Sequence, residues 1–226
     1  MVYRRRNYRR RRWRNRKKIP WYNKKYSAYQ LAQKAWSAAK WAKKHLNVEY
    51  KFLDTAINVT QGSDTATLQP LTLINQGDGA SNREGLSLKG VSLQIKGTIA
   101  DETGNNTLCR LILFRYFDDD VSNAPVTSGN TPLILAANVQ SLRSVPGSSK
   151  YQVLMDKRIP ITNNATSEIV PVDFYTKINA HVKYYGSGGN SDTNGGYALW
   201  ILNNYGTTGV SGCTVNLNCR LRFIDN

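Results

Sequence analysis

The hydrophobic pattern of the chain changes near residue 46, and the part before that point has the period of a helix. Residues 27–45, SAYQLAQKAWSAAKWAKKH, are rich in Ala and contain neither Gly nor Pro. Ser27 can cap the first turn, and lysines gather towards the other end, where they suit the helix dipole. The stretch predicts one short helix. Its apolar residues recur at helical spacing: Leu31, Ala35, Ala38, Ala42 and Leu46.

After residue 46 apolar and polar positions alternate, which is the period of a β-strand with one buried face. The clearest case is the last segment, where every second residue from Cys213 to Phe223 is apolar and polar residues stand between them. In a second case Val91, Leu93, Ile95 and Ile99 alternate with Ser92, Gln94, Lys96 and Thr98. The predicted strands, about eight in all, cover residues 48–59, 91–99, 107–117, 150–155, 168–174, 177–185, 197–203 and 213–223.

These strands follow one another without helical patterns between them, which indicates an antiparallel sandwich or barrel. We expect an all-β fold, a single eight-stranded antiparallel jelly-roll sandwich formed by residues 45–226, preceded by a basic and partly helical arm, residues 1–44. The connections at residues 60–85 and 118–149 are longer than hairpin loops, and loops of that length commonly serve a function. The stretch GSGGNSDTNGG, residues 186–196, reads as a flexible loop.

The predicted strand at residues 107–117 is apolar on both faces. Its first face carries Leu108, Ile112, Phe114 and Tyr116, and its second carries Cys109, Leu111 and Leu113. One face packs in the sandwich, so the other must also be covered. A neighbouring subunit and a loop folded back from the same chain explain this equally well.

The distribution of charge separates the arm from the rest of the chain. Residues 1–44 hold 17 Lys and Arg and no Asp or Glu, so this part alone carries +17 of a chain whose net charge is +16. The remaining residues have a formal charge of −1. Self-repulsion should keep the arm extended, and a polyanion is the partner that fits it best.

The arm combines arginines, which grip phosphate oxygens bidentately, with aromatic rings on which unpaired bases can stack. Tyr3, Tyr8, Trp21, Tyr22, Tyr26 and Tyr29 stand among the charges, so the pattern favours single-stranded nucleic acid. An import signal or a solvated tail is the simpler alternative, and a membrane-surface helix would bury little area through its Ala-rich stripe. The residues expected to bind nucleic acid are Arg4, Arg5, Arg6, Arg9, Arg10, Arg11, Arg12, Trp13, Arg14, Arg16, Lys17, Lys18, Lys24, Lys25, Lys34, Lys40, Lys43 and Lys44. The basic residues among them from Arg4 to Lys18 also form the expected nuclear-import signal.

Catalytic and metal sites are not predicted. Of the two histidines, His45 falls in the basic helix and His181 in an alternation that exposes it. Asp118, Asp119 and Asp120 could hold a cation, but adjacent acids in a loop more often face solvent. The three cysteines lack a CxxC pair and fall in predicted strands, which indicates buried thiols and no disulfide or zinc site. No cofactor, no secretion signal and no membrane insertion are expected.

Five segments behind the basic arm carry a resemblance to a known family. They are VEYKFLD (residues 48–54), NREGLSLKGVSLQIKGTI (82–99), CRLILFRYFDD (109–119), YQVLMDKRIPI (151–161) and CRLRFID (219–225). In this order the chain resembles the capsid proteins of circoviruses and related Rep-encoding viruses with circular single-stranded DNA genomes. The helix at residues 27–45 is more regular than the arms of that family.

The resemblance implies a jelly-roll shell domain in residues 45–226, an icosahedral shell with T = 1 symmetry built from on the order of sixty identical copies, and an internal arm that binds the single-stranded DNA genome. It further implies host nuclear-import receptors as partners, an unidentified host-cell attachment receptor, and localisation to the virion and the host nucleus. Two alternatives remain open from the residues: an RNA satellite-virus capsid protein and a cellular basic nucleic-acid-binding protein. A jelly-roll enzyme or lectin would need pocket chemistry that the sequence does not indicate.

Overall fold

The structure, a computed structural model, describes residues 26–45, 49–62, 66–101, 106–118, 121, 124–127, 132–162, 168–188, 193–204 and 211–225. The chain divides into two compact units, residues 1–47 and residues 48–226. The first contains the helix and the second contains the sheets.

The helix of the first unit is α1 (Ala28–His45), as the sequence pattern predicts. Ser27 stands directly before it, and its Oγ accepts a hydrogen bond from the backbone N–H of Gln30 at 3.3 Å. The Oε1 of Gln30 in turn accepts from the backbone N–H of Ser27 at 3.2 Å. This reciprocal pair is a capping box, which provides partners for N–H groups that a helix start leaves unpaired. The predicted cap at Ser27 is confirmed.

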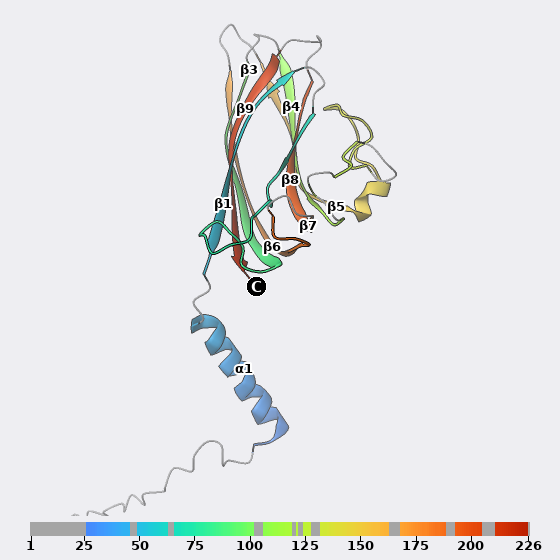
Figure 1. Cartoon of the computed structure of the whole chain (residues 1–226). Coiled ribbons are helices and arrows are strands. Elements are labelled where there is room, and N and C mark those ends of the chain that lie inside the picture. Colours follow the sequence, from blue (N-terminus) through green and yellow to red (C-terminus); the bar gives the residue numbers. More distant parts are fainter. Residues whose placement is uncertain are drawn as a thin grey trace, which may run out of the picture. The chain divides into compact units, whose positions relative to one another are not determined.

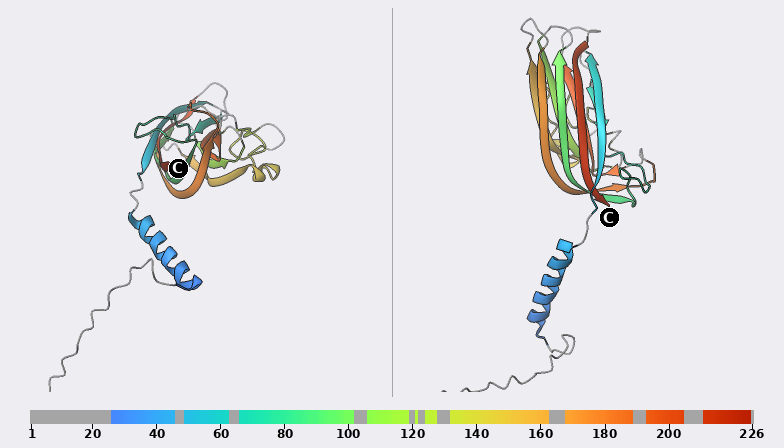
Figure 2. Two further views of the ribbon diagram at one scale, coloured as in Figure 1. Left: turned by 60° about the horizontal axis from the view of Figure 1, so that its bottom comes forward. Right: turned by 90° about the vertical axis from the view of Figure 1, so that its left-hand side faces the viewer.

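The second unit is built from two sheets (Figure 1). The larger has the strand order β1-β9-β3-β6-β7, and the smaller has the order β2-β8-β4-β5. In the right-hand view of Figure 2, β6, β3, β9 and β1 lie side by side in the larger sheet. The strands are β1 (Lys51–Gly62), β2 (Ala66–Pro70), β3 (Ser87–Asp101), β4 (Thr107–Tyr116), β5 (Tyr151–Ile161), β6 (Ile169–Tyr184), β7 (Thr193–Asn194), β8 (Gly196–Asn204) and β9 (Ser211–Asp225), and a 3-10 turn, η2 (Pro146–Ser149), precedes β5.

The strands pair from the two ends of this unit inwards. β1 pairs with β9, β2 with β8, β3 with β6 and β4 with β5, and every pair is antiparallel. This nested double strand is rolled up, so that β3 also pairs with β9 and β4 with β8. Such a closure of two Greek keys defines the jelly roll. The predicted eight-stranded all-β jelly-roll sandwich is confirmed, and the two-residue β7 only extends one edge.

The main core lies between the two sheets. β9 contributes every second residue from Cys213 to Phe223, and each of these is at most 2% exposed. Cys109, Leu111 and Leu113 of β4 belong to the same cluster. The predicted alternation of β9 is therefore confirmed, and its buried face is one wall of the core.

The outer face of β4 is covered by residues of the same chain. The covering segment is the connection between β4 and β5, drawn in yellow-green beside the smaller sheet in Figure 1. Of the two explanations that the sequence left open, a loop of the same chain is the one found. The cluster contains Ile112, Phe114, Tyr116, Val121, Ala124, Leu133, Ile134, Val139, Tyr151, Ala198, Trp200 and Leu202.

Two strand assignments from the sequence are wrong, and a third, at residues 150–155, is too short because β5 continues to Ile161. The first places residues 60–85 in a loop, whereas they contain β2, which pairs with β8 at an edge of its sheet. Its five residues, ATLQP, end at a proline and are too few to show an alternation. The second splits residues 168–174 from 177–185, whereas both belong to β6. Tyr175 and Thr176 continue that strand opposite Gln94 and Leu93 of β3.

The alternation of β3 is also interrupted near its start. The register of β3 shifts between Gly90 and Ser92 against both of its neighbours, which marks a β-bulge. Val91 lies at this bulge and is only half-buried, whereas Ser92 keeps its predicted face opposite Arg222 although it is only 8% exposed. From Leu93 onwards the predicted faces hold, with Leu93 and Ile99 fully buried.

Candidate nucleic-acid interface

Most of the predicted nucleic-acid-binding residues lie outside the part of the chain that the structure describes. Lys34 and Lys40 are described and lie on α1. Lys43 and Lys44 belong to the last turn of α1, but their side chains lie outside the described residues, as does the side chain of His45. The remaining predicted residues, also outside it, are Arg4, Arg5, Arg6, Arg9, Arg10, Arg11, Arg12, Trp13, Arg14, Arg16, Lys17, Lys18, Lys24 and Lys25.

The two described lysines of α1 each contact an aromatic ring of the same unit. The Nζ of Lys34 donates a hydrogen bond to the Tyr26 hydroxyl at 3.0 Å and lies 4.1 Å from the centre of its ring. The Nζ of Lys40 lies 5.2 Å from the ring centre of Trp36, one turn earlier. Charge and ring surface are thus presented together, which is the combination that suits a phosphate beside an unpaired base.

Lys51, the first residue of β1, forms two ion pairs within the second unit. The Nζ of Lys51 contacts Oδ2 of Asp225 and Oε1 of Glu84, each at 2.8 Å, and its side chain is only 6% exposed. Hydrogen bonds to Asp225 and Glu84 raise the pKa of Lys51 above its ordinary value. These contacts join the start of β1 to the end of β9. β1, the first strand after the arm in the sequence, is therefore held by its hydrogen bonds to β9 and by the ion pairs of its first residue, Lys51.

The larger sheet presents a polar and aromatic outer face, meaning the side that points away from the smaller sheet. We call it the outer sheet face. Its residues form rows across β1, β9, β3 and β6. One row is Asp54, Arg220, Gln94 and Tyr175, and its neighbour is Ala56, Asn218, Lys96 and Asp173. The sequence analysis did not single out this surface, although the polar positions of β9 already indicated a solvent-facing side.

Arginine and aromatic side chains lie against each other on this face. Arg220 donates to Asp54 through Nε and Nη2, both at 2.7 Å, which is a bidentate pair. The hydrogen bonds from Arg220 hold the pKa of Asp54 below its ordinary value. The guanidinium of Arg222 lies 3.6 Å from the centre of the Tyr50 ring, and that of Arg220 lies 5.6 Å from the centre of the Phe52 ring. Contacts of this kind fix the direction of flexible side chains.

A shallow depression of about 350 Å³ lies in the middle of the outer sheet face. Side-chain amides, a lysine and an arginine surround it, so both hydrogen-bonding and cationic groups are within reach of a small polar ligand. Its lining residues are Asp54, Gln94, Lys96, Asn218, Cys219 and Arg220.

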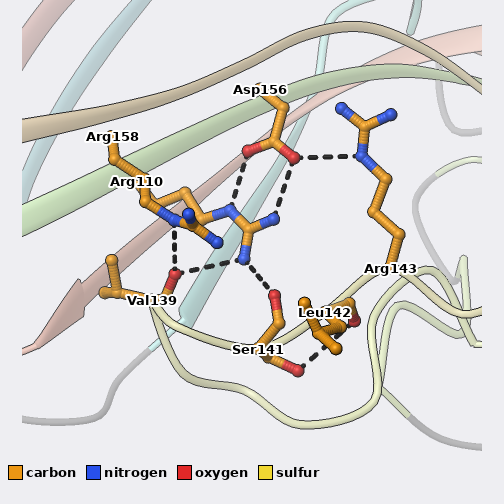
Figure 3. Close-up of polar contacts among 7 residues, drawn as sticks. All are labelled: Arg110, Val139, Ser141, Leu142, Arg143, Asp156 and Arg158. Carbon is orange, nitrogen blue, oxygen red and sulfur yellow. Dashed lines mark hydrogen bonds and ion pairs between the residues drawn. The ribbon is translucent and has the colours of Figure 1, made fainter.

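Two buried arginines, which the sequence analysis did not single out, fasten the long connections. Arg83 is fully buried in the connection before β3, where it donates to the carbonyls of Ile74 at 3.0 Å and of Gly186. Arg110 of β4 donates to Asp156 through Nε at 2.7 Å and Nη2 at 2.8 Å (Figure 3). No spacing in the sequence joins these partners, because Arg110 and Asp156 are 46 residues apart.

Arg110 also holds the loop that covers its own sheet. Its Nη1 donates to the carbonyl of Ser141 at 2.6 Å and to that of Val139 at 3.1 Å. Arg143, from the same loop, donates through Nε to Oδ2 of Asp156 at 3.0 Å, and Figure 3 shows it on the other side of the carboxylate. We call this set the Arg110 latch. It fixes the loop between β4 and β5 to the smaller sheet.

The remaining candidates for chemistry have structural positions. His181 is an exposed residue of β6, as predicted. Cys109, Cys213 and Cys219 are buried free thiols, as predicted. Asp118 pairs with Lys150, while Asp119 and Asp120 lie outside the described residues. Among the residues that the structure describes, no group of His, Cys, Asp and Glu could hold a metal ion, and no helix is long and apolar enough to cross a membrane.

Comparison with known proteins gives a distant structural likeness. No family model matches the chain, and no curated protein matches it either. The structure is similar to the T13 particle of infectious bursal disease virus, at 11% identity and a TM-score of 0.24, over 76% of this chain and 31% of that one. It is also similar to the Gx strain of that virus, at 9% identity and a TM-score of 0.22, over 76% of this chain and 33% of that one. The likeness thus spans about a third of each viral chain.

Proposed function

We propose that the protein is a viral capsid protein that assembles into a small icosahedral shell of T = 1 symmetry and packages a circular single-stranded DNA genome with its basic arm. The observation that carries the proposal is the separation of charge from fold. Residues 1–44 hold 17 Lys and Arg without one acidic residue, whereas the chain that follows is close to neutral. The near-neutral part is suited to form a shell wall, and the basic part is suited to bind a polyanion.

The jelly roll supports the role in a shell, because this fold builds the walls of many viral capsids. The loop that the Arg110 latch fastens also leaves apolar side chains in water. Leu135, Leu142 and Val145 are 64%, 70% and 83% exposed, and the backbone N–H of Leu135 donates to the carbonyl of Leu142 at 3.2 Å. Burial of such side chains between copies would give assembly a hydrophobic contribution.

The arm supports the role in packaging. In a closed shell of on the order of sixty copies, the arms together would bring about a thousand positive charges inside, enough to neutralise on the order of a thousand nucleotide phosphates. This capacity matches a small single-stranded genome. Within the first unit, the Nζ of Lys34 lies 4.1 Å from the centre of the Tyr26 ring, so an aromatic ring stands beside the positive charge.

The same proposal assigns the protein a route and a place in the infected cell. The run of arginines and lysines from Arg4 to Lys18 would be read by host nuclear-import receptors before assembly. The assembled protein would then belong to the virion, where exposed loops would meet an attachment receptor on the host cell.

Nuclease protection tests the division between arm and shell. The full-length chain and a variant without residues 1–44 are mixed with circular single-stranded DNA, treated with nuclease, and assayed for intact DNA. Full-length protein should protect the circle. The truncated variant should keep the circular dichroism of a β-sandwich and lose most of the protection, because its phosphate-binding charges are gone.

A matched variant keeps the arm but replaces the arginines and lysines from Arg4 to Lys18 with glutamine. It should behave like the truncated chain, since charge and not length holds the DNA. Equal protection by the truncated and full-length chains would disprove the proposed role of the arm. Preference for a single-stranded RNA circle would favour an RNA satellite-virus capsid, and binding by a chain that stays monomeric would favour a cellular nucleic-acid-binding protein.

A further inference from the structure

We infer that the outer sheet face is a second binding site for single-stranded nucleic acid, separate from the arm, and that this face is therefore turned towards the packaged genome. The inference rests on the proposed function, because it names a second contact of the same cargo. It assigns a ligand to the depression lined by Asp54, Gln94, Lys96, Asn218, Cys219 and Arg220.

Exposed aromatic rings lie on two sides of the depression. Tyr175 on β6 is 56% exposed and ends the row that contains Gln94 and Arg220. Phe52 on β1 is 43% exposed and precedes Asp54 by two residues, so it lies on the same face. β1 and β6 are separated by three strand spacings, or about 14 Å. A single strand can therefore cross the depression and reach both rings.

Polar side chains between the two rings offer hydrogen bonds and positive charge. The amides of Gln94 and Asn218 can donate and accept hydrogen bonds, which suits base edges and sugars. Lys96 and Arg220 can contact phosphate oxygens. Arg220 is already oriented by Asp54 and by the ring of Phe52, so a ligand would meet a preformed group.

The outer sheet face has a net positive charge. The second unit is close to neutral as a whole, but its outer sheet face carries more basic than acidic side chains. The exposed acids Asp54 and Asp173 are each paired with a cation of the face, at 2.7 and 3.4 Å. Its basic residues are Lys89, Lys96, Lys177, Lys183, Arg220 and Arg222. The excess complements the phosphate backbone.

These features favour an unpaired strand over the other occupants. A duplex keeps its bases stacked inside, so it cannot use Phe52 and Tyr175 as platforms. A second copy of the chain would have to bury this charged face, whereas the centres of protein interfaces are depleted in charge. The smaller sheet, by contrast, is already covered by the loop that the Arg110 latch holds.

Photocrosslinking of the full-length chain tests the inference directly. A single-stranded DNA that contains 5-iododeoxyuridine is bound and irradiated, and the crosslinked peptides are identified by mass spectrometry. We expect crosslinks in the arm and also at Phe52 or Tyr175. Phe117 is the matched control, because it is 38% exposed and lies 4.7 Å from the guanidinium of Arg115, but it follows β4 of the other sheet.

The outcomes separate this inference from the proposed function. Crosslinks confined to the arm, or equal yields at Phe117 and Phe52, would overturn the inference and leave the role of the arm intact. Absence of binding and of crosslinks anywhere, together with absence of particles, would overturn both.

Affinity measurements give a second test that does not depend on crosslinking yield. The double variant Phe52→Ala with Tyr175→Ala is compared with Phe117→Ala for binding of an oligo(dT) strand at 0.5 M salt, where the phosphate contacts of the arm and of the face are both weakened and stacking on the rings contributes a larger share. We expect the double variant to bind at least about thirtyfold more weakly, because two stacking platforms are lost, and Phe117→Ala to bind as the unchanged chain does. Unchanged affinity combined with loss of particles in the double variant would identify the face as a contact between copies and overturn the inference.

Discussion

At the scale of single residues, buried arginines stabilise a fold whose loops are long. Arg110 is 2% exposed and uses Asp156 and two loop carbonyls as partners, so its charge and most of its N–H donors are satisfied. The hydrogen bonds from Arg110 lower the pKa of Asp156, and those from Arg143 add to the effect. A buried ion pair that loses one partner leaves an uncompensated charge, which makes the latch sensitive to single substitutions.

We predict that Asp156→Asn lowers the free energy of unfolding by about 2–4 kcal/mol. Urea unfolding followed by circular dichroism measures the change. Asp173→Asn is the control, because the pair of Asp173 with Lys96 is 3.4 Å long and exposed, and its loss should change stability by no more than about 0.5 kcal/mol. Equal effects of the two substitutions would show that the latch does not stabilise the loop.

The same carboxylate predicts a dependence on pH. Because the folded pKa of Asp156 lies below the unfolded value of about 3.9, its contribution is complete above that value and is lost as the pH falls through the folded pKa. Unfolding measured between pH 6 and pH 2 should therefore show a smaller loss of stability in Asp156→Asn than in the unchanged chain. Identical pH profiles of Asp156→Asn and the unchanged chain would show that protonation of Asp156 does not cause the loss of stability at low pH.

The cysteines give a further prediction at this scale. Burial raises the pKa of Cys219 to about 12, and contact with Cys213 together with burial raises that of Cys109. Because the thiolate is the reactive form, iodoacetamide at pH 8 should leave both residues unmodified in the native protein and label them in urea. Mass spectrometry distinguishes the two states. Rapid labelling of the native protein would mean that the core opens more readily than the packing indicates.

At the scale of elements, the sequence predicts most clearly those strands that have one solvent-facing and one buried face. β9 is predicted along its buried length because Cys213, Val215, Leu217, Cys219, Leu221 and Phe223 alternate with polar residues. β2 is missed because an edge strand of five residues carries too few buried positions to form a pattern. The bulge near Gly90 is likewise invisible, since it depends on the register with β6 and β9.

The candidate sites follow the same division. Charge counting finds the arm, because its basic residues are consecutive. The outer sheet face combines Asp54, Arg220, Gln94 and Tyr175 from four strands, and the Arg110 latch joins residues of β4 and β5 with the loop between them. Neither set is contiguous in sequence, so only the strand order brings its members together.

Gly97 provides a test of the packing between strands. It lies in the middle of β3 with φ at 158°, and a Cβ built there would be 2.0 Å from the backbone oxygen of Asn216 on β9. Gly97→Ala should therefore cost about 3–5 kcal/mol or prevent folding. Thermal unfolding measures the effect.

Gly79→Ala is the matched control for that substitution. A Cβ at Gly79 would meet only the amide end of the Asn82 side chain, at 3.0 Å, which can move aside. Its effect should stay within about 1 kcal/mol. A mild effect of Gly97→Ala would show that β3 and β9 are less tightly joined than their register indicates.

At the scale of the whole molecule, we propose that the arm binds the genome, and that the jelly roll forms the shell wall and also contacts the genome through one face. The jelly roll has a covered side, where the loop between β4 and β5 packs on the smaller sheet, and a basic, aromatic side on the larger sheet. In the sequence, β1 of that larger sheet is the first strand after the arm. Arm and outer sheet face are thus the two surfaces proposed to meet the genome, and binding by both should weaken steeply as salt rises.

Negative-stain electron microscopy of the purified full-length protein at moderate salt tests whether copies of this chain close into a shell, as we propose. We expect uniform, closed, small icosahedral particles, formed by the protein alone or after addition of single-stranded DNA. Persistent absence of closed particles across a range of salt concentrations, with and without added single strands, would contradict this proposal.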